Sequence, residues 1–162
     1  MAAKTNELKV TLPSDLEIQL VREFDAPVRL VFEASTKPEY VKQWWGPHGT
    51  SLSVCEIDFR VGGEWRYIVR SQDGSEAPFR GVYREIVPAE RVSYTWIYDV
   101  PPFDQFEAIE TVVLEERDGR TIATTTVLHQ TKEARDGHVQ SGMERGAAET
   151  LDRLEELLTK MI

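Results

Sequence analysis

Aromatic side chains recur at every second position in several predicted strands, and this spacing is the clearest chemical signal in the chain. Residues two apart in a strand point to the same face of a sheet, so these rings would share one surface. Such a surface, with polar tips on its rings, suits a small hydrophobic or aromatic ligand. Each ring taken singly also fits ordinary sheet packing, because aromatic residues favour strands. The set is Trp65, Tyr67, Tyr83, Tyr94, Trp96 and Tyr98.

A second aromatic group, Trp44 and Trp45, is followed directly by Gly46-Pro47. Proline has no backbone donor and disfavours helix in the residue before it, so we expect the pair where a short helix ends. Two large rings with one polar edge each can gate the entrance of an apolar cavity. The alternative is that one ring fills the end of the core while the other lies on the surface.

The histidines and the single cysteine offer little metal chemistry. His48, His129 and His138 do not share the spacing of metal ligands, and Cys55 is remote from all three, so we predict no metal site. His129 ends the last predicted strand, where it would either contact a ligand, transfer a proton or serve as a structural hydrogen-bonding residue. His48 and His138 are expected at the surface.

No residue pattern identifies a catalytic centre. Glu64, Glu85 and Glu110 would be general bases only if they were buried, and we expect strand glutamates to face water. Asp58 and Arg60 lie two apart before a Gly-Gly turn, which favours a salt bridge that holds the hairpin. Because the chain also has no G-x-S-x-G elbow and no phosphate-binding loop, we assign no catalytic residue and no cofactor.

The elements that position these residues follow from periodicity. Residues 16–24 alternate as a half-buried strand, Asp25 is the predicted N-cap of a first short helix, and a second runs from Glu39 to Trp44. Short turns then separate the remaining strands, and short connections imply antiparallel neighbours. Six further strands are predicted at 52–59, 64–71, 79–87, 91–100, 106–116 and 120–130.

The last element is a long helix with one apolar stripe from Met143 to Met161. At 1.5 Å per residue it is about 30 Å long, which is enough to cover the apolar face of a small sheet. Small residues in its first turns, among them Gly146 and Ala147, would leave volume beneath it. We therefore predict an α+β fold in which a seven-stranded antiparallel sheet wraps around a long C-terminal helix, with two short helices between strands 1 and 2.

The overall amino-acid composition is typical of a globular protein. The chain has 162 residues, 41% hydrophobic and 29% charged, which predicts one soluble domain. A net charge of −9 opposes binding to nucleic acid or to acidic membranes. Residues 1–7 are polar and show no signal peptide or membrane span, so a cytoplasmic location is expected.

An ordered set of motifs links the chain to a known family. It resembles the homologues of the heat shock protein 90 ATPase activator's C-terminal domain, within the START-like or SRPBCC superfamily that includes the birch pollen allergen and polyketide cyclases. The resemblance runs from about Leu16 to Leu158. The motifs are Asp25-Ala26-Pro27 with Val31-Phe32, Trp44-Trp45-Gly46-Pro47, Asp58-x-Arg60-x-Gly62-Gly63-x-Trp65-Arg66, Gly81-x-Tyr83-x-x-Ile86-x-Pro88-x-Glu90-Arg91, and Gly142-Met143-Glu144-x-Gly146 leading into Leu151-Asp152-x-Leu154.

This resemblance implies a helix-grip fold that forms a single domain over residues 1–162, with its core at about 16–160, and a ligand cavity between the sheet and the C-terminal helix. Many relatives carry Gly-Trp where this chain has Gly146-Ala147, so the missing indole would widen the cavity. The expected partner is a small hydrophobic molecule. The residues expected to bind it are Trp44, Trp45, Trp65, Tyr67, Tyr83, Tyr94, Trp96, His129, Met143 and Ala147.

Two other functions remain open. The family implies a co-chaperone that stimulates a chaperone ATPase during stress, although the eukaryotic activator uses a separate N-terminal docking domain for which this chain has no room. The superfamily also implies a cyclase- or hydrolase-type enzyme that uses a buried carboxylate or His129 in the same cavity. Pairing of sheet edges would allow a homodimer.

Overall fold

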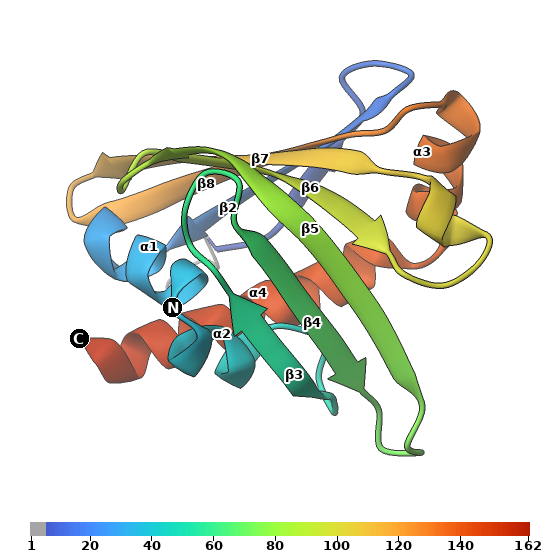
Figure 1. Ribbon diagram of the computed structural model, residues 1–162. Coiled ribbons are helices and arrows are strands. Elements are labelled where there is room, and N and C mark those ends of the chain that lie inside the picture. Colours follow the sequence, from blue (N-terminus) through green and yellow to red (C-terminus); the bar gives the residue numbers. More distant parts are fainter. Residues whose placement is uncertain (1–5) are drawn as a thin grey trace.

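The structure is a computed structural model that describes residues 6–162, and in these residues a long helix lies on the concave side of one curved antiparallel sheet (Figure 1). Its elements in chain order are β1 Lys9–Thr11, β2 Glu17–Phe24, α1 Val28–Thr36, α2 Pro38–Trp44, β3 Ser51–Ile57, β4 Glu64–Arg70, β5 Glu76–Val87, β6 Arg91–Tyr98, the 3-10 helix η1 Phe103–Gln105, β7 Ala108–Arg117, β8 Arg120–Leu128, α3 Lys132–Gln140 and α4 Met143–Met161.

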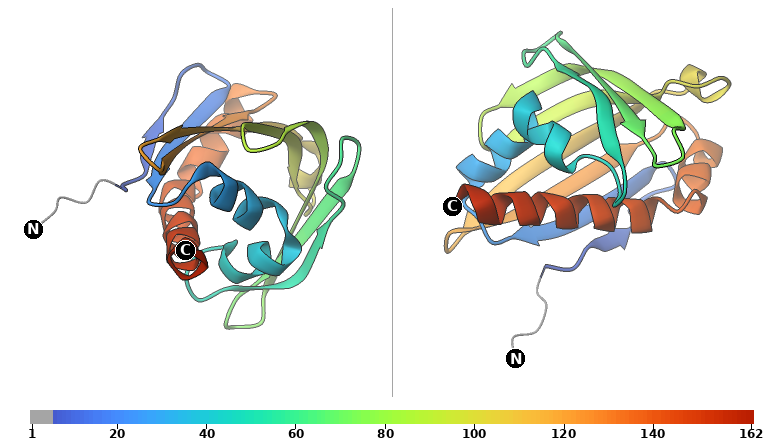
Figure 2. Two further views of the ribbon diagram at one scale, coloured as in Figure 1. Left: turned by 90° about the vertical axis from the view of Figure 1, so that its left-hand side faces the viewer. Right: turned by 90° about the horizontal axis from the view of Figure 1, so that it is seen from below.

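The sheet order is β1-β2-β8-β7-β6-β5-β4-β3, and every neighbouring pair is antiparallel. The strands from β3 to β8 therefore follow one another as a meander, as their short turns predict. Helices α1 and α2 connect β2 to β3, which lies at the opposite edge of the sheet. The two views of Figure 2 show the sheet curling over α4, with α1 and α2 beside the C-terminal part of that helix.

The two halves of α4 have different surroundings. Its C-terminal half packs Leu154, Leu157 and Leu158 into a buried cluster that also contains residues of α1, α2 and β2. Its N-terminal half faces the middle of the sheet through smaller residues, among them Gly146 and Ala147. The fold is thus the predicted helix-grip arrangement, with a solid core at one end of α4.

The structure adds elements that the periodicity did not predict. The sheet has eight strands rather than seven, because β1 pairs with β2 from Lys9↔Val21 to Thr11↔Gln19. Three residues are too few to show a period of two. A separate helix, α3, precedes α4, and Gly142 lies between them with a left-handed φ of 85°. Glycine adopts this conformation without the steric cost that a side chain would impose.

The predicted N-cap role of Asp25 is wrong. The N-cap position of α1 is Pro27, which makes no capping hydrogen bond, and the backbone N–H of Val28 donates instead to Oε1 of Glu116 at 2.9 Å. The Asp25 carboxylate instead binds Arg120, with 2.7 Å between Oδ1 and Nε, so it ties the start of β8 to the β2–α1 turn.

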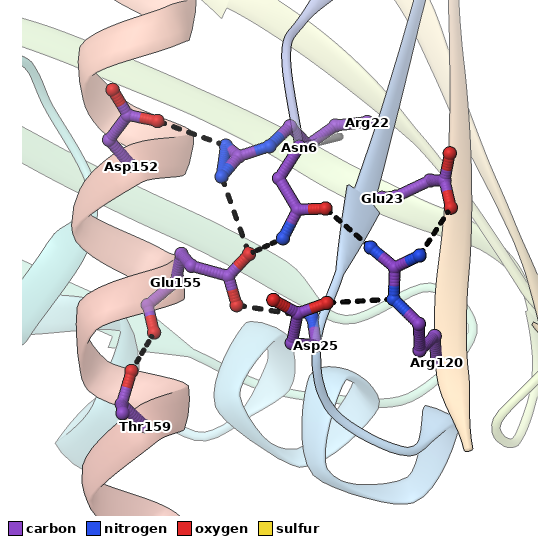
Figure 3. A network of polar contacts seen from close by, with 8 residues as sticks. All are labelled: Asn6, Arg22, Glu23, Asp25, Arg120, Asp152, Glu155 and Thr159. Carbon is purple, nitrogen blue, oxygen red and sulfur yellow. Dashed lines mark hydrogen bonds and ion pairs between the residues drawn. The ribbon is translucent and has the colours of Figure 1, made fainter. Parts of the chain in front are cut away.

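The same network fixes α4 to the sheet (Figure 3). Arg22 of β2 is only 4% exposed and lies in register with the apolar residues Leu20 and Phe24. Its guanidinium contacts Asp152 at 3.1 Å and Glu155 at 3.4 Å, both on α4. Glu155 also accepts a hydrogen bond from the backbone N–H of Asp25 at 3.2 Å. One buried cation therefore holds the helix over this edge of the sheet.

None of the helices within residues 6–162 is both long enough and apolar enough to cross a lipid bilayer.

Candidate functional site

A cavity of about 560 Å³ lies between the concave face of the sheet and the N-terminal half of α4. Strands β2 and β4 to β8 form its wall, α4 covers it through Met143, Gly146 and Ala147, and α1 and α2 close one end. No atom lies within 4 Å of the position that a Cβ would take at Gly146. The small residues in the first turns of α4 therefore leave the interior volume that the sequence predicts.

The apolar core consists of three clusters of buried residues that border this cavity. One lies between α4 and the short helices, one on β4 to β6 with α2, and one on β2, β7 and β8. Members of all three line the cavity, for example Leu154, Tyr67 and Val127. Protein interiors ordinarily pack to crystal-like density with few voids larger than a water molecule. A space of this size is accordingly a feature of the fold rather than a packing defect.

The aromatic residues form a continuous wall from one end of the cavity to the other. Trp96 packs on Phe79 with a centroid distance of 5.6 Å, Phe79 on Trp45 at 5.3 Å, and Trp45 on Tyr67 at 4.9 Å. The row continues through Trp65, 4.8 Å from Tyr67 and 5.8 Å from Tyr94, and on to Tyr83. Most of these pairs are tilted or edge-to-face, as ring quadrupoles favour.

Nine of the ten predicted site residues line this cavity: Trp44, Trp45, Trp65, Tyr67, Tyr83, Tyr94, Trp96, Met143 and Ala147. The tenth, His129, is 7% exposed and lies outside the lining. Its Nε2 is 3.0 Å from Nδ1 of His138, which does line the cavity. Tyr98 also lies outside, stacked on Phe79 and Phe103.

The two adjacent tryptophans have different environments. Trp44 is 7% exposed and belongs to the core cluster beside α4, and its Nε1 donates a hydrogen bond to the carbonyl of Ala34 at 2.9 Å. Trp45 is half-buried against the sheet aromatics. The alternative in which one of the two tryptophans lies on the surface is therefore wrong. Helix α2 ends at Trp44, where the Gly46-Pro47 turn was predicted to end it.

The expected surface position of His138 is wrong. The His138 ring stacks on Trp96 with a centroid distance of 5.2 Å and an interplanar angle of 15°. Burial, together with the neighbouring His129, lowers the pKa of His138 to about 4. The pattern after Thr131 was predicted to be helical but not to form a separate helix, and the three-four spacing of Arg135, His138 and Val139 marks the inner face of this helix.

Glu110 is the second cavity residue that was expected elsewhere. Glu64 and Glu85 are exposed as expected, but the Glu110 side chain faces the cavity and accepts a hydrogen bond on Oε2 from the hydroxyl of Tyr94. Burial raises the pKa of Glu110, while the hydrogen bond from Tyr94 opposes that rise. The sequence did contain a signal for this position. Glu110 is two residues from both Ala108 and Val112, so the three side chains lie on the same face of β7.

Tyrosines surround this carboxyl group. Burial raises the pKa of Tyr94 well above its ordinary value, and the charge of Glu110 adds to the rise. Burial likewise raises the pKa of Tyr67, with Tyr83 and Glu110 as smaller contributors. These phenols therefore stay protonated and act as neutral hydrogen-bonding groups in an otherwise apolar wall.

The remaining sequence candidates lie outside the cavity. Asp58 and Arg60 form an exposed ion pair at 2.9 Å, in agreement with the salt-bridge interpretation. Within residues 6–162, no three His, Cys, Asp or Glu side chains come together as a group that could hold a metal ion.

Comparison with known proteins agrees with this architecture. The profile of the family described as Activator of Hsp90 ATPase homolog 1-like protein matches residues 25–159. No curated protein matches the chain significantly.

Several solved structures have the same fold. A protein from Nitrosomonas europaea is 29% identical, with 93% of this chain and 98% of that chain covered and a TM-score of 0.80. A protein from Rhodobacter sphaeroides is 22% identical, with 96% and 100% covered and a TM-score of 0.87. The AHSA1 protein from Silicibacter pomeroyi is 23% identical, with 90% and 99% covered and a TM-score of 0.73.

Proposed function

The chain belongs to the family of Activator of Hsp90 ATPase homolog 1-like proteins, and we propose that it binds a small hydrophobic or aromatic molecule in the cavity beneath α4. The observation that carries this proposal is an interior volume of about 560 Å³ lined largely by aromatic and aliphatic side chains. Ligand sites of drug-sized molecules commonly measure roughly 300–1,000 Å³ and have a mostly apolar lining.

The chemistry of the lining supports a carrier role. Water gains few hydrogen bonds beside Trp65, Val112 and Leu154, so replacing it with an apolar molecule is favourable. The hydroxyls of Tyr67 and Tyr83 provide the few polar contacts that would orient such a molecule.

The test is a substitution that fills the cavity. Ala147→Trp places an indole in the lining of α4, whereas Glu156→Trp places the same side chain on an exposed part of the same helix. We expect Nile red, a neutral apolar dye, to bind the natural chain with one-to-one stoichiometry and to raise its melting temperature. Ala147→Trp should abolish binding while the protein stays folded, and Glu156→Trp should bind normally. Equal binding by all three proteins, or no binding by the natural chain, contradicts the proposal.

Family membership favours a second candidate, stimulation of a chaperone ATPase. This function would place a docking surface on the outside of the domain, so Ala147→Trp should leave it intact. The measurement is the steady-state ATPase rate of a heat shock protein 90 chaperone with and without the domain. An unchanged rate and no association removes this candidate.

The buried carboxyl group favours a third candidate, a cyclase- or hydrolase-type enzyme in the same cavity. General acid–base catalysis needs a group whose pKa is shifted toward neutral pH, and burial shifts the pKa of Glu110 in that direction. Turnover of model esters that is lost in Glu110→Gln would support an enzyme. Binding without turnover leaves the carrier role.

A further inference from the structure

Glu110 is a half-buried carboxyl group in the wall of a largely apolar cavity, and within residues 6–162 no basic side chain forms an ion pair with it. We infer that the ligand of this cavity carries a positively charged nitrogen on an apolar or aromatic body, and that Glu110 binds this nitrogen. The inference rests on the proposed ligand-binding function and adds the chemical class of the ligand.

The geometry of the Glu110 carboxyl group leaves one of its oxygens free to contact a ligand. Glu110 of β7 lies directly opposite Tyr94 of β6 in the sheet register. The Tyr94 hydroxyl donates to Oε2, which fixes the side chain in the cavity wall. Among residues 6–162 no hydrogen-bond donor contacts the second oxygen, Oε1, and the atom is not sealed from the cavity. One oxygen of an oriented carboxyl group is thus open to a bound molecule.

Among the described residues, no lysine or arginine side chain balances the charge of Glu110. In the part of the chain that the structure describes, Arg91 is the only lysine or arginine in the cavity lining. Its side chain is 53% exposed and its Nε lies 2.9 Å from Glu85 outside the cavity. A carboxylate removed from water without a counter-ion is unfavourable. A ligand cation would supply the counter-ion that the protein lacks, and this favours amines over neutral molecules of the same shape.

The surroundings of Glu110 also suit a cation. Tyr67 and Tyr83 lie in the same cluster and offer phenol oxygens as further acceptors for an ammonium group, which has only donors. Aromatic rings attract cations through their quadrupole. An anionic headgroup would meet the opposite conditions, because its nearest fixed charge would be a carboxylate. The net charge of −9 further favours approach of a cation.

The experiment compares three ligands with one shared carbon skeleton: phenylbutylamine, phenylbutanol and phenylbutyrate. Their affinities are measured at neutral pH by isothermal titration calorimetry. The natural chain should bind the amine roughly tenfold or more tightly than the alcohol, because a buried charge pair is stronger than a neutral hydrogen bond. The carboxylate should bind most weakly.

The decisive variant is Glu110→Gln, which keeps the size of the side chain and can still accept from Tyr94. Glu115→Gln is the matched control, since it removes the same charge from an exposed position on the same strand. Glu110→Gln should reduce the affinity for the amine roughly tenfold or more and leave the affinity for the alcohol within about twofold. Glu115→Gln should change neither affinity by more than about twofold.

The outcomes separate the two proposals. If the alcohol binds as tightly as the amine, or if Glu110→Gln weakens both equally, the preference for a cation is wrong while ligand binding stands. If the carboxylate binds most tightly, the assigned ligand class is also wrong. If none of the three ligands binds and Nile red does not bind either, the proposed function itself fails.

Discussion

At the scale of single residues, the pair His129 and His138 beside the cavity makes the protein sensitive to pH. His129 follows β8 and His138 lies on α3, and their rings are joined through a contact of 3.0 Å between Nε2 and Nδ1. Burial lowers the pKa of both imidazoles, and for His129 the charge of Arg135 adds to this effect. Both rings are therefore neutral at neutral pH, and His138 stacks on Trp96 as an uncharged aromatic group.

This pair predicts a loss of stability in acid. The folded pKa of His138 is about 4 against an ordinary 6.5, so the unfolded chain binds the proton more readily between these values. Stability is then fully present above about pH 6.5 and decreases by about 3 kcal/mol as the pH falls to about 4. Urea unfolding measured at several pH values should show this decrease.

The matched variants are His138→Phe, which keeps an aromatic ring on Trp96, and His48→Phe, which changes an exposed histidine. His138→Phe should flatten the pH dependence of stability between about pH 6.5 and 4. His48→Phe should preserve the dependence of the natural chain. The same slope in all three proteins would show that the histidine pair does not determine it.

At the scale of elements, the buried guanidinium of Arg22 holds α4 to the sheet through Asp152 and Glu155, while the N-terminal half of the helix covers the cavity. Arg22 depends on Asp152 and Glu155 for its charge balance, and both acids lie on the face of α4 toward β2. The polar network therefore holds α4 against β2, together with the apolar packing of Leu154, Leu157 and Leu158. The position of α4 in turn sets the depth of the cavity beneath Gly146 and Ala147.

Removing one acid should leave a buried cation with incomplete compensation. Glu155→Ala deletes the contact with Arg22 and the acceptor for the backbone N–H of Asp25. We expect the free energy of unfolding to fall by about 2–4 kcal/mol in urea denaturation. The neighbouring Glu156→Ala, at an exposed position, should change it by less than about 0.5 kcal/mol. Similar values for both variants would mean that the network contributes little.

The aromatic wall depends on a close approach between β5 and β6 at Gly81. A Cβ at this position would lie 1.8 Å from the carbonyl oxygen of Thr95 and 2.5 Å from Nε1 of Trp65. Gly81→Ala should thus separate the strands, displace the indole and lower the free energy of unfolding by about 2 kcal/mol or more.

The opposite result is expected at Gly137 of α3, where a Cβ would meet no atom within 4 Å. Gly137→Ala should raise the free energy of unfolding by roughly 0.5–1 kcal/mol, because alanine favours the helix and restricts the unfolded chain. Thermal denaturation of the two variants should show a lower stability for Gly81→Ala and a higher stability for Gly137→Ala. A stable Gly81→Ala protein would refute the packing argument.

At the scale of the whole molecule, the net negative charge bears on the proposed binding of a cationic ligand. A net charge of −9 on 162 residues attracts cations over a distance that salt shortens to about 8 Å at physiological ionic strength.

This field predicts a selective salt effect. The association rate of phenylbutylamine, measured by stopped-flow tryptophan fluorescence, should fall as the salt concentration rises. The rate for phenylbutanol should stay nearly constant, which makes the alcohol the control. Parallel behaviour of the two ligands would show that the field does not steer the amine.

Local patterns in the sequence predicted the architecture and nine of the residues that line the cavity. Alternation predicted seven of the eight strands, turn residues predicted their antiparallel order, and the stripe on Met143–Met161 predicted the covering helix. These features depend on neighbours only a few residues apart, so a single chain is enough to detect them. For the same reason, the three-residue strand β1 had no detectable pattern.

The tertiary structure alone decided which charged side chains lie inside. Arg22 and Glu110 both lie on the apolar face of their strands. Arg22 contacts two carboxylates of α4, whereas Glu110 contacts only the hydroxyl of Tyr94 on β6. Asp152 and Glu155 lie 130 and 133 residues after Arg22, so the local spacing of residues cannot predict these contacts. The volume of the cavity also depends on the tertiary structure, because it is set by the distance between the curved sheet and α4.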